Sequence, residues 1–165
     1  MKNWKLLLIG VGILFAGPQS FAEDWKGTPD LGDMSFGGVT GLGIIDGTAG
    51  YSLIGSLSGK IISNGFIPSL TDSVSLEGMF GPFFMSNMTA WLYSAHLRWD
   101  FEKDSTWTFF AIGGVGGNFK SVNSNAQFEM TPRFGVGAFW KLSSQVRLRG
   151  DIAHDLIAVG VNVPF

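Results

Sequence analysis

The most regular pattern in the chain is an alternation of apolar and polar positions between Phe128 and Trp140. Every second residue of this stretch is apolar, and the residues between them include Glu129, Arg133 and two glycines. A period of two predicts a β-strand with two different faces. The apolar face begins and ends in a large aromatic side chain, whereas the other face carries charges of both signs. This pattern is typical of a strand with lipid on one side and a packed polar interior on the other.

Segments of this kind recur along the chain and are separated by turn signals such as Asp46-Gly47, Ser86-Asn87 and the polar run 102–105. We expect eight strands, over residues 34–44, 50–62, 73–85, 88–101, 106–119, 127–141, 145–153 and 156–165. Most of these lengths suit the 9–11 or so residues with which a tilted strand crosses a bilayer. The body of the chain has no apolar stretch of about 18 residues, so a closed barrel is the remaining way to span a membrane. The sequence thus predicts an all-β, eight-stranded antiparallel up-and-down transmembrane barrel.

Two features of the predicted strands and loops depart from the simplest barrel. Pro82 and Pro132 fall inside strands and cannot donate a ladder hydrogen bond, so we expect a local bulge at each. An even number of strands places both termini at one end, here called the inner end. The outer connections are predicted to be short, at 46–50, 86–87, 120–126 and 153–155. The longest connection, 64–72, is predicted at the inner end, although outer loops are normally the long ones.

Large aromatic residues fall near both ends of the predicted strands. At about 3.3 Å per residue and a tilt near 40°, the step from Trp107 to Phe119 rises roughly 30 Å, and the step from Trp91 to Trp99 roughly 20 Å. These values bracket the apolar band of about 25 Å of outer-membrane barrels. The alternative, a soluble two-sheet core, would need this placement to arise by coincidence on several strands. We expect an inner aromatic belt of Trp99, Phe101, Trp107, Trp140 and Phe165, and an outer belt of Tyr51, Phe84, Trp91, Phe119 and Phe128.

The opposite face of the strands carries the ionisable residues. The predicted lumen network consists of Glu77, His96, Arg98, Asp100, Glu129, Arg133, Arg147, Arg149 and Asp151, with Lys60 as a further candidate. An eight-stranded barrel is just wide enough inside for side chains to fill it, so these charges must pair. We expect Arg98, Asp100, Arg147 and Arg149 to cluster in the inner half, and Glu129, Arg133 and Asp151 to lie nearer the outer end. Glycines such as Gly114, Gly116, Gly135 and Gly137 leave room for the arginine side chains.

Composition and the N-terminal segment restrict the class of protein further. Charged residues make up 15% of the 165 residues, against roughly 25% in soluble domains. The net charge of −2 and the lack of a basic run argue against a nucleic-acid partner, and the lack of cysteine removes disulfides and thiol catalysis. Lys2 and Lys5 precede an apolar stretch, and Ser20-Phe21-Ala22 forms a cleavage site. We therefore expect a cleaved signal peptide over 1–22, rather than a retained anchor, a polar periplasmic lead over 23–33, and the barrel over 34–165.

The C-terminal third resembles a known family. Residues 132–151 read PRFGVGAFWKLSSQVRLRGD, which is similar to the penultimate hairpin of the small outer-membrane β-barrel family that includes the transmembrane domain of OmpA and the OmpX-like proteins. Residues 159–165 resemble the family's last strand, although Pro164 departs from it. The resemblance implies a monomer in the bacterial outer membrane, in contact with lipid and lipopolysaccharide. It also implies periplasmic chaperones and the barrel-assembly machinery as partners during biogenesis, with Phe165 as part of the assembly signal.

Three functions remain open from the sequence. The first is a structural or envelope-supporting barrel whose lumen is closed by ion pairs. The second is a surface-binding barrel, adhesin-like or receptor-like, that uses its short outer loops, and the third is a narrow channel. Lipid A deacylases of this size use a His-x-Ser pair, whereas Ser94-Ala95-His96 has the reverse order and is predicted to point inward. His154-Asp155 forms an outer turn that offers at most a loose cation site, so we expect no enzyme, cofactor or metal centre.

Overall fold

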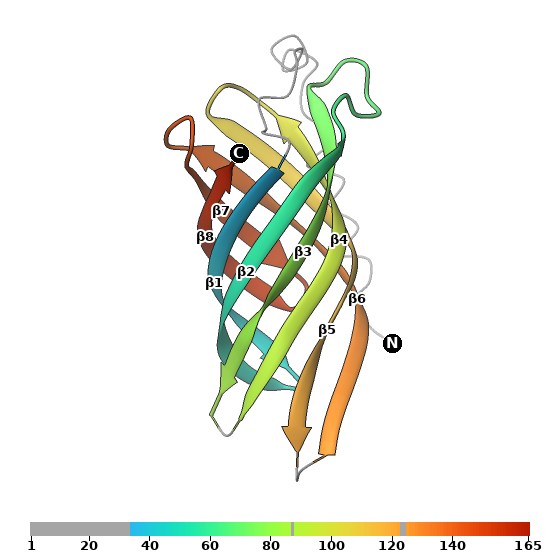
Figure 1. Ribbon diagram of the computed structural model, residues 1–165, viewed down its shortest axis with the longest axis vertical. Coiled ribbons are helices and arrows are strands. Elements are labelled where there is room, and N and C mark those ends of the chain that lie inside the picture. The colour runs from blue at the N-terminus through green and yellow to red at the C-terminus, as the bar shows by residue number, and fades with distance from the viewer. Residues whose placement is uncertain (1–33, 87, 123–124) are drawn as a thin grey trace, which may run out of the picture.

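The chain forms a closed barrel of eight antiparallel strands in a computed structural model that describes residues 34–86, 88–122 and 125–165 (Figure 1). The predicted signal peptide and polar lead lie outside the described residues. Each strand pairs with its neighbours in the chain, and β8 closes the barrel against β1. The strands are β1 Met34–Ile45, β2 Thr48–Ile62, β3 Asp72–Met85, β4 Thr89–Glu102, β5 Trp107–Val122, β6 Asn125–Lys141, β7 Arg147–Ala153 and β8 Leu156–Pro164. Within the part of the chain that is described, no helix is long and apolar enough to cross a membrane.

The predicted eight-stranded meander is confirmed, but the predicted outer loop 120–126 is wrong. The β5–β6 ladder continues past the aromatic pair Phe119–Phe128 to the pair Val122–Asn125. Figure 1 shows this hairpin projecting furthest at the end opposite the C-terminus. The apolar alternation stops at Phe119, so the part of the hairpin beyond it has no continuous apolar face. Backbone hydrogen bonds do not depend on that alternation, so the two strands stay paired without it.

The pairing register sets the tilt of the strands. The stagger can be traced from Trp107 of β5 by stepping from each residue to its partner on the next strand until β5 is reached again. The path returns at Gly117, ten residues further along the strand. A stagger of this size in eight strands corresponds to a tilt near 40°, at which each residue rises about 2.5 Å. The interior is then just wide enough to be filled by side chains.

Pro82 interrupts its ladder without the predicted bulge. Pairing of β2 with β3 stops between Ser52–Phe83 and Gly55–Phe80, and it resumes in the same register. The proline nitrogen therefore leaves a gap in the hydrogen bonds but adds no residue to the strand. The register shift of this pair lies at the inner end instead, between Lys60 and Ile62.

Pro132 also causes no bulge, because it lies on a strand edge that sequence reasoning did not foresee. It stays in register with Val115 of β5, whereas β6 pairs with β7 only from Gly135 onward. The backbone carbonyl of Phe134 points toward β7, where it accepts a hydrogen bond from the His154 amide. The backbone polar groups of residues two apart on a strand point to the same side, so those of Pro132 also face β7. The nitrogen of Pro132 therefore faces the unpaired edge, where no donor is needed.

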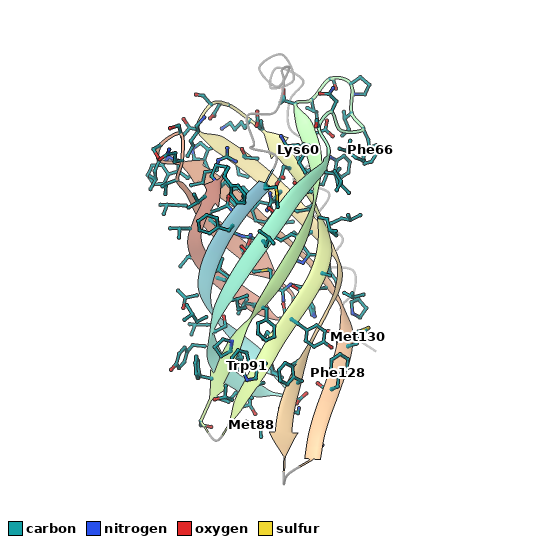
Figure 2. The ribbon with its side chains drawn as sticks, in the orientation of Figure 1. Lys60, Phe66, Met88, Trp91, Phe128 and Met130 are labelled. Atoms are coloured by element: carbon teal, nitrogen blue, oxygen red, sulfur yellow. The ribbon has the colours of Figure 1, made fainter. Side chains whose placement is uncertain are left out.

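The connections at the two ends differ in construction. The outer β1–β2 turn places Asp46 and Gly47 at φ values of 49° and 74°, as a two-residue hairpin turn requires. At the inner end, the long connection 63–71 folds back onto Asp72. The Asp72 carboxylate accepts hydrogen bonds from the Phe66 amide (3.0 Å) and the Trp99 indole (2.7 Å). This long connection lies at the same end as the C-terminus, as the topology predicts (Figures 1 and 2).

The second inner turn, between β4 and β5, is held by Asp104. Its carboxylate accepts from the backbone amides of Thr106 (2.8 Å) and Trp107 (2.9 Å). These two hydrogen bonds favour the charged form and lower the pKa of Asp104 below its usual value.

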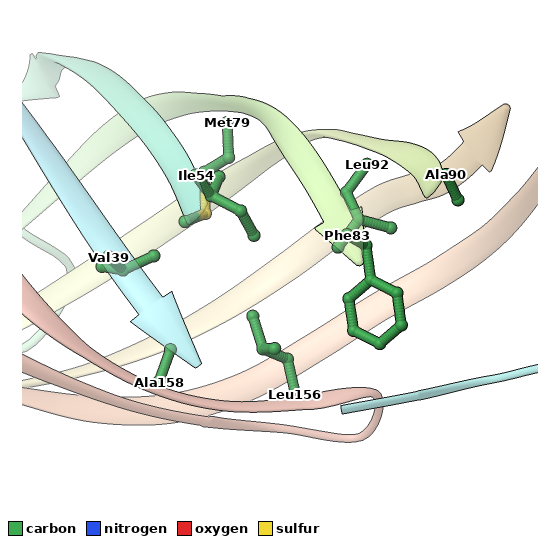
Figure 3. Close-up of a cluster of buried hydrophobic side chains, with 8 residues drawn as sticks. All are labelled: Val39, Ile54, Met79, Phe83, Ala90, Leu92, Leu156 and Ala158. Carbon is green, nitrogen blue, oxygen red and sulfur yellow. The ribbon is translucent and has the colours of Figure 1, made fainter. Parts of the chain in front are cut away.

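The interior has two layers of different chemistry. In the outer half, apolar side chains from five strands meet inside the barrel (Figure 3). They are Val39, Ile54, Met79, Phe83, Ala90, Leu92, Leu156 and Ala158, here called the apolar lumen cluster. In the inner half the interior is polar and charged. The outside surface of the barrel wall, by contrast, carries exposed Leu, Ile, Val or Phe side chains on every strand.

Candidate functional site: an ion-pair plug in the lumen

Glu77 of β3 is the centre of the charged layer. Its side chain is fully buried, and its carboxylate is reached from two other strands. Arg98 of β4 approaches it at 3.3 Å, and Arg149 of β7 donates to both of its oxygens. His96 of β4 adds a contact from its Nε2 atom at 3.2 Å. One carboxylate thus joins strands from opposite sides of the barrel.

Each arginine is also held by a carboxylate on its own strand. Arg98 donates to both oxygens of Asp100, from Nε at 2.8 Å and from an Nη atom at 3.2 Å. Arg149 donates from Nε to both oxygens of Asp151, at 2.9 and 3.1 Å. Residues two apart on a strand share a face, so both pairs point into the lumen. The Arg98–Asp100 pair is bidentate and fixes the guanidinium plane as well as its charge, whereas the single Nε of Arg149 is shared between the two oxygens of Asp151.

Two phenylalanines complete the layer. Phe110 of β5 and Phe139 of β6 are buried, with ring centroids 4.9 Å apart. The guanidinium carbon of Arg98 lies 4.9 Å from the Phe139 ring, and that of Arg149 lies 5.2 Å from the Phe110 ring. Attraction between a cation and an aromatic face is strongest where water is excluded. Sequence reasoning missed both rings, although their lumen-facing parity was available as a signal.

We call this layer of ionic and aromatic side chains the ion-pair plug. It consists of Glu77, His96, Arg98, Asp100, Arg149, Asp151, Phe110 and Phe139. These residues come from five of the eight strands, and Ser58 of β2 adds an acceptor for Arg98 at 3.4 Å. Two arginines face three carboxylates, so removal of one arginine would leave buried negative charge without compensation.

The remaining predicted lumen residues are distributed differently from expectation. Asp151 belongs to the inner cluster with Arg149, not to the outer group. Arg133 pairs at 3.0 Å with Asp155, a turn residue outside the predicted set, and Glu129 is exposed and accepts from Asn118 at 2.9 Å. Arg147 is buried in the inner half, as expected. Strand parity is correct in each case, but the choice of partner depends on how far the strands are staggered.

The lumen glycines serve two purposes. A Cβ atom at Gly116 would lie 3.3 Å from Arg133, so this glycine leaves room for an arginine as expected. A Cβ at Gly137 would instead collide with the Phe110 ring. That glycine therefore makes room for an aromatic side chain of the plug.

A second set of ion pairs lies at the outer mouth. Lys120 of β5 contacts Asp46 in the β1–β2 turn. These elements are not neighbours in the barrel, so the pair ties one side of the mouth to another. Asp155 in the β7–β8 turn anchors Arg133 of β6 in the same region.

The aromatic residues of the two predicted belts lie on the outer wall and contact one another. At the inner end Trp107 stacks on Trp140 at 5.8 Å, and Trp99 packs on Phe101 at 4.8 Å. Phe165 lies 5.9 Å from the ring of Phe36. The outer set also contacts in pairs: Tyr51 with Phe84, Trp91 with Phe119, and Phe128 with Tyr93. Figure 2 places Trp91 and Phe128 toward the outer end and Phe66 at the inner one.

The residues weighed for catalysis or metal binding do not assemble a reactive site. Ser94 and His96 both face the lumen, but Nε2 of His96 is directed at Glu77. His154 stacks on Phe134 at 4.9 Å, and its Nδ1 atom is 3.9 Å from Asp155. Among the described residues, no group of three or more His, Cys, Asp or Glu side chains is placed to hold a metal ion.

Comparisons with known proteins place this geometry in context. No family model and no curated protein sequence matches the chain. Among solved structures, the chain is similar to the N-terminal β-barrel domain of Pseudomonas aeruginosa OprF, with a TM-score of 0.60 at 14% identity over 82% of this chain and 99% of that one.

Two further barrels show the same similarity. Neisserial surface protein A (NspA) gives a TM-score of 0.56 at 12% identity, with 85% of this chain and all of that chain covered. The attachment invasion locus protein Ail of Yersinia pestis gives 0.55 at 12% identity, covering 80% and 96%. The chain therefore has the closed eight-stranded fold of the small outer-membrane β-barrels, the group that its C-terminal hairpin resembles.

Proposed function

We propose that this chain is an integral outer-membrane barrel with a structural, envelope-supporting role and a lumen closed by the ion-pair plug. The observation that carries the proposal is the convergence of Arg98 and Arg149 on Glu77 between the rings of Phe110 and Phe139. Side chains from five strands meet at one level, where the lumen is only wide enough to be filled by side chains. The apolar lumen cluster adds a second filled layer nearer the outer end of the barrel.

The membrane location is supported by the exposed apolar wall and by the fold shared with OprF, NspA and Ail. We propose export through the signal peptide, contact with lipid and lipopolysaccharide, and a monomeric state. Assembly by periplasmic chaperones and the barrel-assembly machinery would use Phe165 as part of the signal. The absence of catalysis belongs to the same proposal, since His96 serves the plug.

The experiment is a planar-bilayer recording of the purified, folded barrel, paired with the gel mobility of unheated and heated samples. Heat-modifiable mobility reports a closed barrel, and envelope fractionation reports its location. We expect a folded barrel in the outer-membrane fraction with no steady current. A steady open current from the native protein would refute the plug and favour the narrow channel.

One observation favours a surface-binding role as the second candidate. The β5–β6 hairpin extends beyond the aromatic pair Phe119–Phe128 and projects past the other outer turns (Figure 1). A hairpin whose backbone is paired can present side chains to a partner at a smaller ordering cost than an irregular loop. Deletion of residues 121–126 with retained heat-modifiable mobility, followed by a test of cell adherence, distinguishes this role from a structural one.

A further inference from the structure

The barrel wall is lower at the β7–β8 hairpin than at its neighbours. Trp140 of β6 and Leu148 of β7 are paired at the inner end. From this level, β6 extends toward the outer end as far as Asn125, whereas β7 already ends at Ala153. On the other side, β8 pairs with β1 only up to Gly43–Leu156, and β1 continues to Ile45. The result is an indentation in the outer rim, with the turn 154–155 as its floor.

A surface hollow with a mainly apolar lining lies on the β1–β2 side of this indentation. Its lining includes Leu42, Ile44, Tyr51, His154, Leu156 and Ile157, and we call it the rim notch. The carboxylate of Asp155 at its floor is paired with Arg133, which lies inside the barrel. The charge of Asp155 is therefore compensated, and apart from His154 the other lining residues are aliphatic, aromatic or glycine.

The notch lies at the level of the outer aromatic residues. Leu42 pairs with Ile157 on one side and with Tyr51 on the other, and Tyr51 stacks on Phe84 at 4.9 Å. The side chains of Leu42 and Ile157 point to the outside of the barrel, where 71% and 62% of their surfaces are exposed. In the proposed outer-membrane location, this level contains the acyl chains just below the lipid headgroups.

The notch is also continuous with the apolar interior. Leu156 lines the notch and belongs to the apolar lumen cluster. Gly43 and Gly50, which also line it, allow the ring of Phe83 to approach the wall from inside, because a Cβ at Gly43 would lie 3.3 Å from that ring. A ligand in the notch would therefore have hydrocarbon on two sides.

The unpaired edge of β6 beside the notch is unsuited to a protein strand. Pro132 presents no amide donor along that edge, and proline is a common way to prevent strand addition. At the foot of the edge, His154 stacks on Phe134 and donates its amide to the Phe134 carbonyl. These features disfavour both an added peptide strand and edge pairing with a second barrel.

We propose that the rim notch binds one hydrocarbon chain of an outer-leaflet lipid, seated over Leu42 and Ile157 beside Tyr51. This inference rests on the proposed membrane location but not on the closure of the lumen. It differs from general contact with the bilayer, because it assigns one chain to one place on the wall.

The test uses the barrel in lipid nanodiscs that contain a phosphatidylethanolamine with a photoreactive diazirine in its acyl chain. Cross-links are mapped by mass spectrometry, and retained lipid is counted on the intact protein by native mass spectrometry. We expect one retained lipid per barrel and cross-links concentrated on the notch. The variant Leu42→Ser/Ile157→Ser should weaken retention about tenfold, because it removes two apolar contacts.

A matched control lies next to the notch. Leu53 and Val159 flank Thr40 on the same outer face, with 60% and 63% exposure, but they do not line the notch. Leu53→Ser/Val159→Ser should therefore retain the lipid, and heat-modifiable mobility confirms that both variants are folded.

Three results would overturn the inference: cross-links spread evenly over the wall, equal lipid loss in both variants, or a barrel dimer in place of a lipid-bound monomer. A folded, non-conducting barrel with either of the first two results would leave the proposed function standing, whereas a dimer would also contradict the proposed monomeric state. Failure of the barrel to enter the membrane fraction would instead remove the proposed function.

Discussion

Arg149 offers the sharpest test of the ion-pair plug. The substitution Arg149→Met removes the cation but keeps a long, polarisable side chain against Phe110 and Phe139. Glu77 and Asp151, both buried, would then lose the guanidinium they share. Breaking a buried ion pair by removing one partner costs about 3–5 kcal/mol, because the other charge stays buried.

The size of this effect depends on what remains around Glu77. Arg98 still lies 3.3 Å from it, so one of the two carboxylates keeps a partial partner. We therefore expect the free energy of unfolding to fall by about 3–5 kcal/mol, the cost of one broken pair rather than two. Asp151→Asn in the Arg149→Met background should recover part of the loss, since it removes the charge left without a partner.

The assay is equilibrium unfolding by urea of the barrel in phospholipid bicelles, followed by tryptophan fluorescence and by gel mobility without heating. A constant denaturant slope would show that the two variants unfold between the same states. Arg133→Met is the matched control, because its partner Asp155 keeps 27% of its side-chain surface exposed. Arg133 itself is buried, so its loss should cost more than the roughly 0–1 kcal/mol of a surface pair. It should cost less than the loss of Arg149, because water reaches the charge left on Asp155. If Arg149→Met and Arg133→Met differ by less than about 1 kcal/mol, the plug is hydrated and the reasoning is wrong.

Three further predictions follow from the same geometry. Arg98→Ala should cost a few kcal/mol in the same assay, because it leaves Asp100 buried without its bidentate partner; unchanged unfolding would contradict this. The lowered pKa of Asp104 means that its charged form stabilises the inner turn above its unfolded pKa near 4, and that this contribution disappears as the pH falls through the lower folded pKa. Between pH 5 and pH 2 the native barrel should therefore lose more stability than Asp104→Asn, and parallel pH profiles would contradict this assignment. Asp72→Ala should free the connection 63–71 and red-shift the fluorescence of Trp99, because Phe66 of that connection would no longer cover the Trp99 ring and water would reach it; protease sensitivity of this connection is the second readout.

Much of the architecture was predictable because it depends on local patterns. The alternation around Phe134 fixed which face of β6 meets the interior, and the same parity rule assigned Arg98 and Arg149 to the lumen correctly. Turn residues such as Asp46-Gly47 located the hairpins. These features require only the period of a strand and the chemistry of a short turn.

Two of the errors, those at Pro132 and at the loop 120–126, share one cause, which is the unequal length of neighbouring strands. The predicted bulge at Pro132 assumed that β6 has a partner along its whole length, and the predicted loop 120–126 assumed that pairing ends where the apolar pattern ends. The structure shows a long β5–β6 hairpin beside a short β7–β8 hairpin. No local signal in the sequence states how far a ladder continues once it leaves the apolar layer.

The sequence by itself determined the number of strands, their order, and which side chains face inward, because each depends on residues close together in the chain. The closed barrel alone decided which charges meet. Glu77 and Arg149 are 72 positions apart and touch because a stagger of ten residues brings β3 and β7 to the same level across the lumen. That stagger is a property of the whole ring of eight pairings, since a change in any one register would move every contact across it.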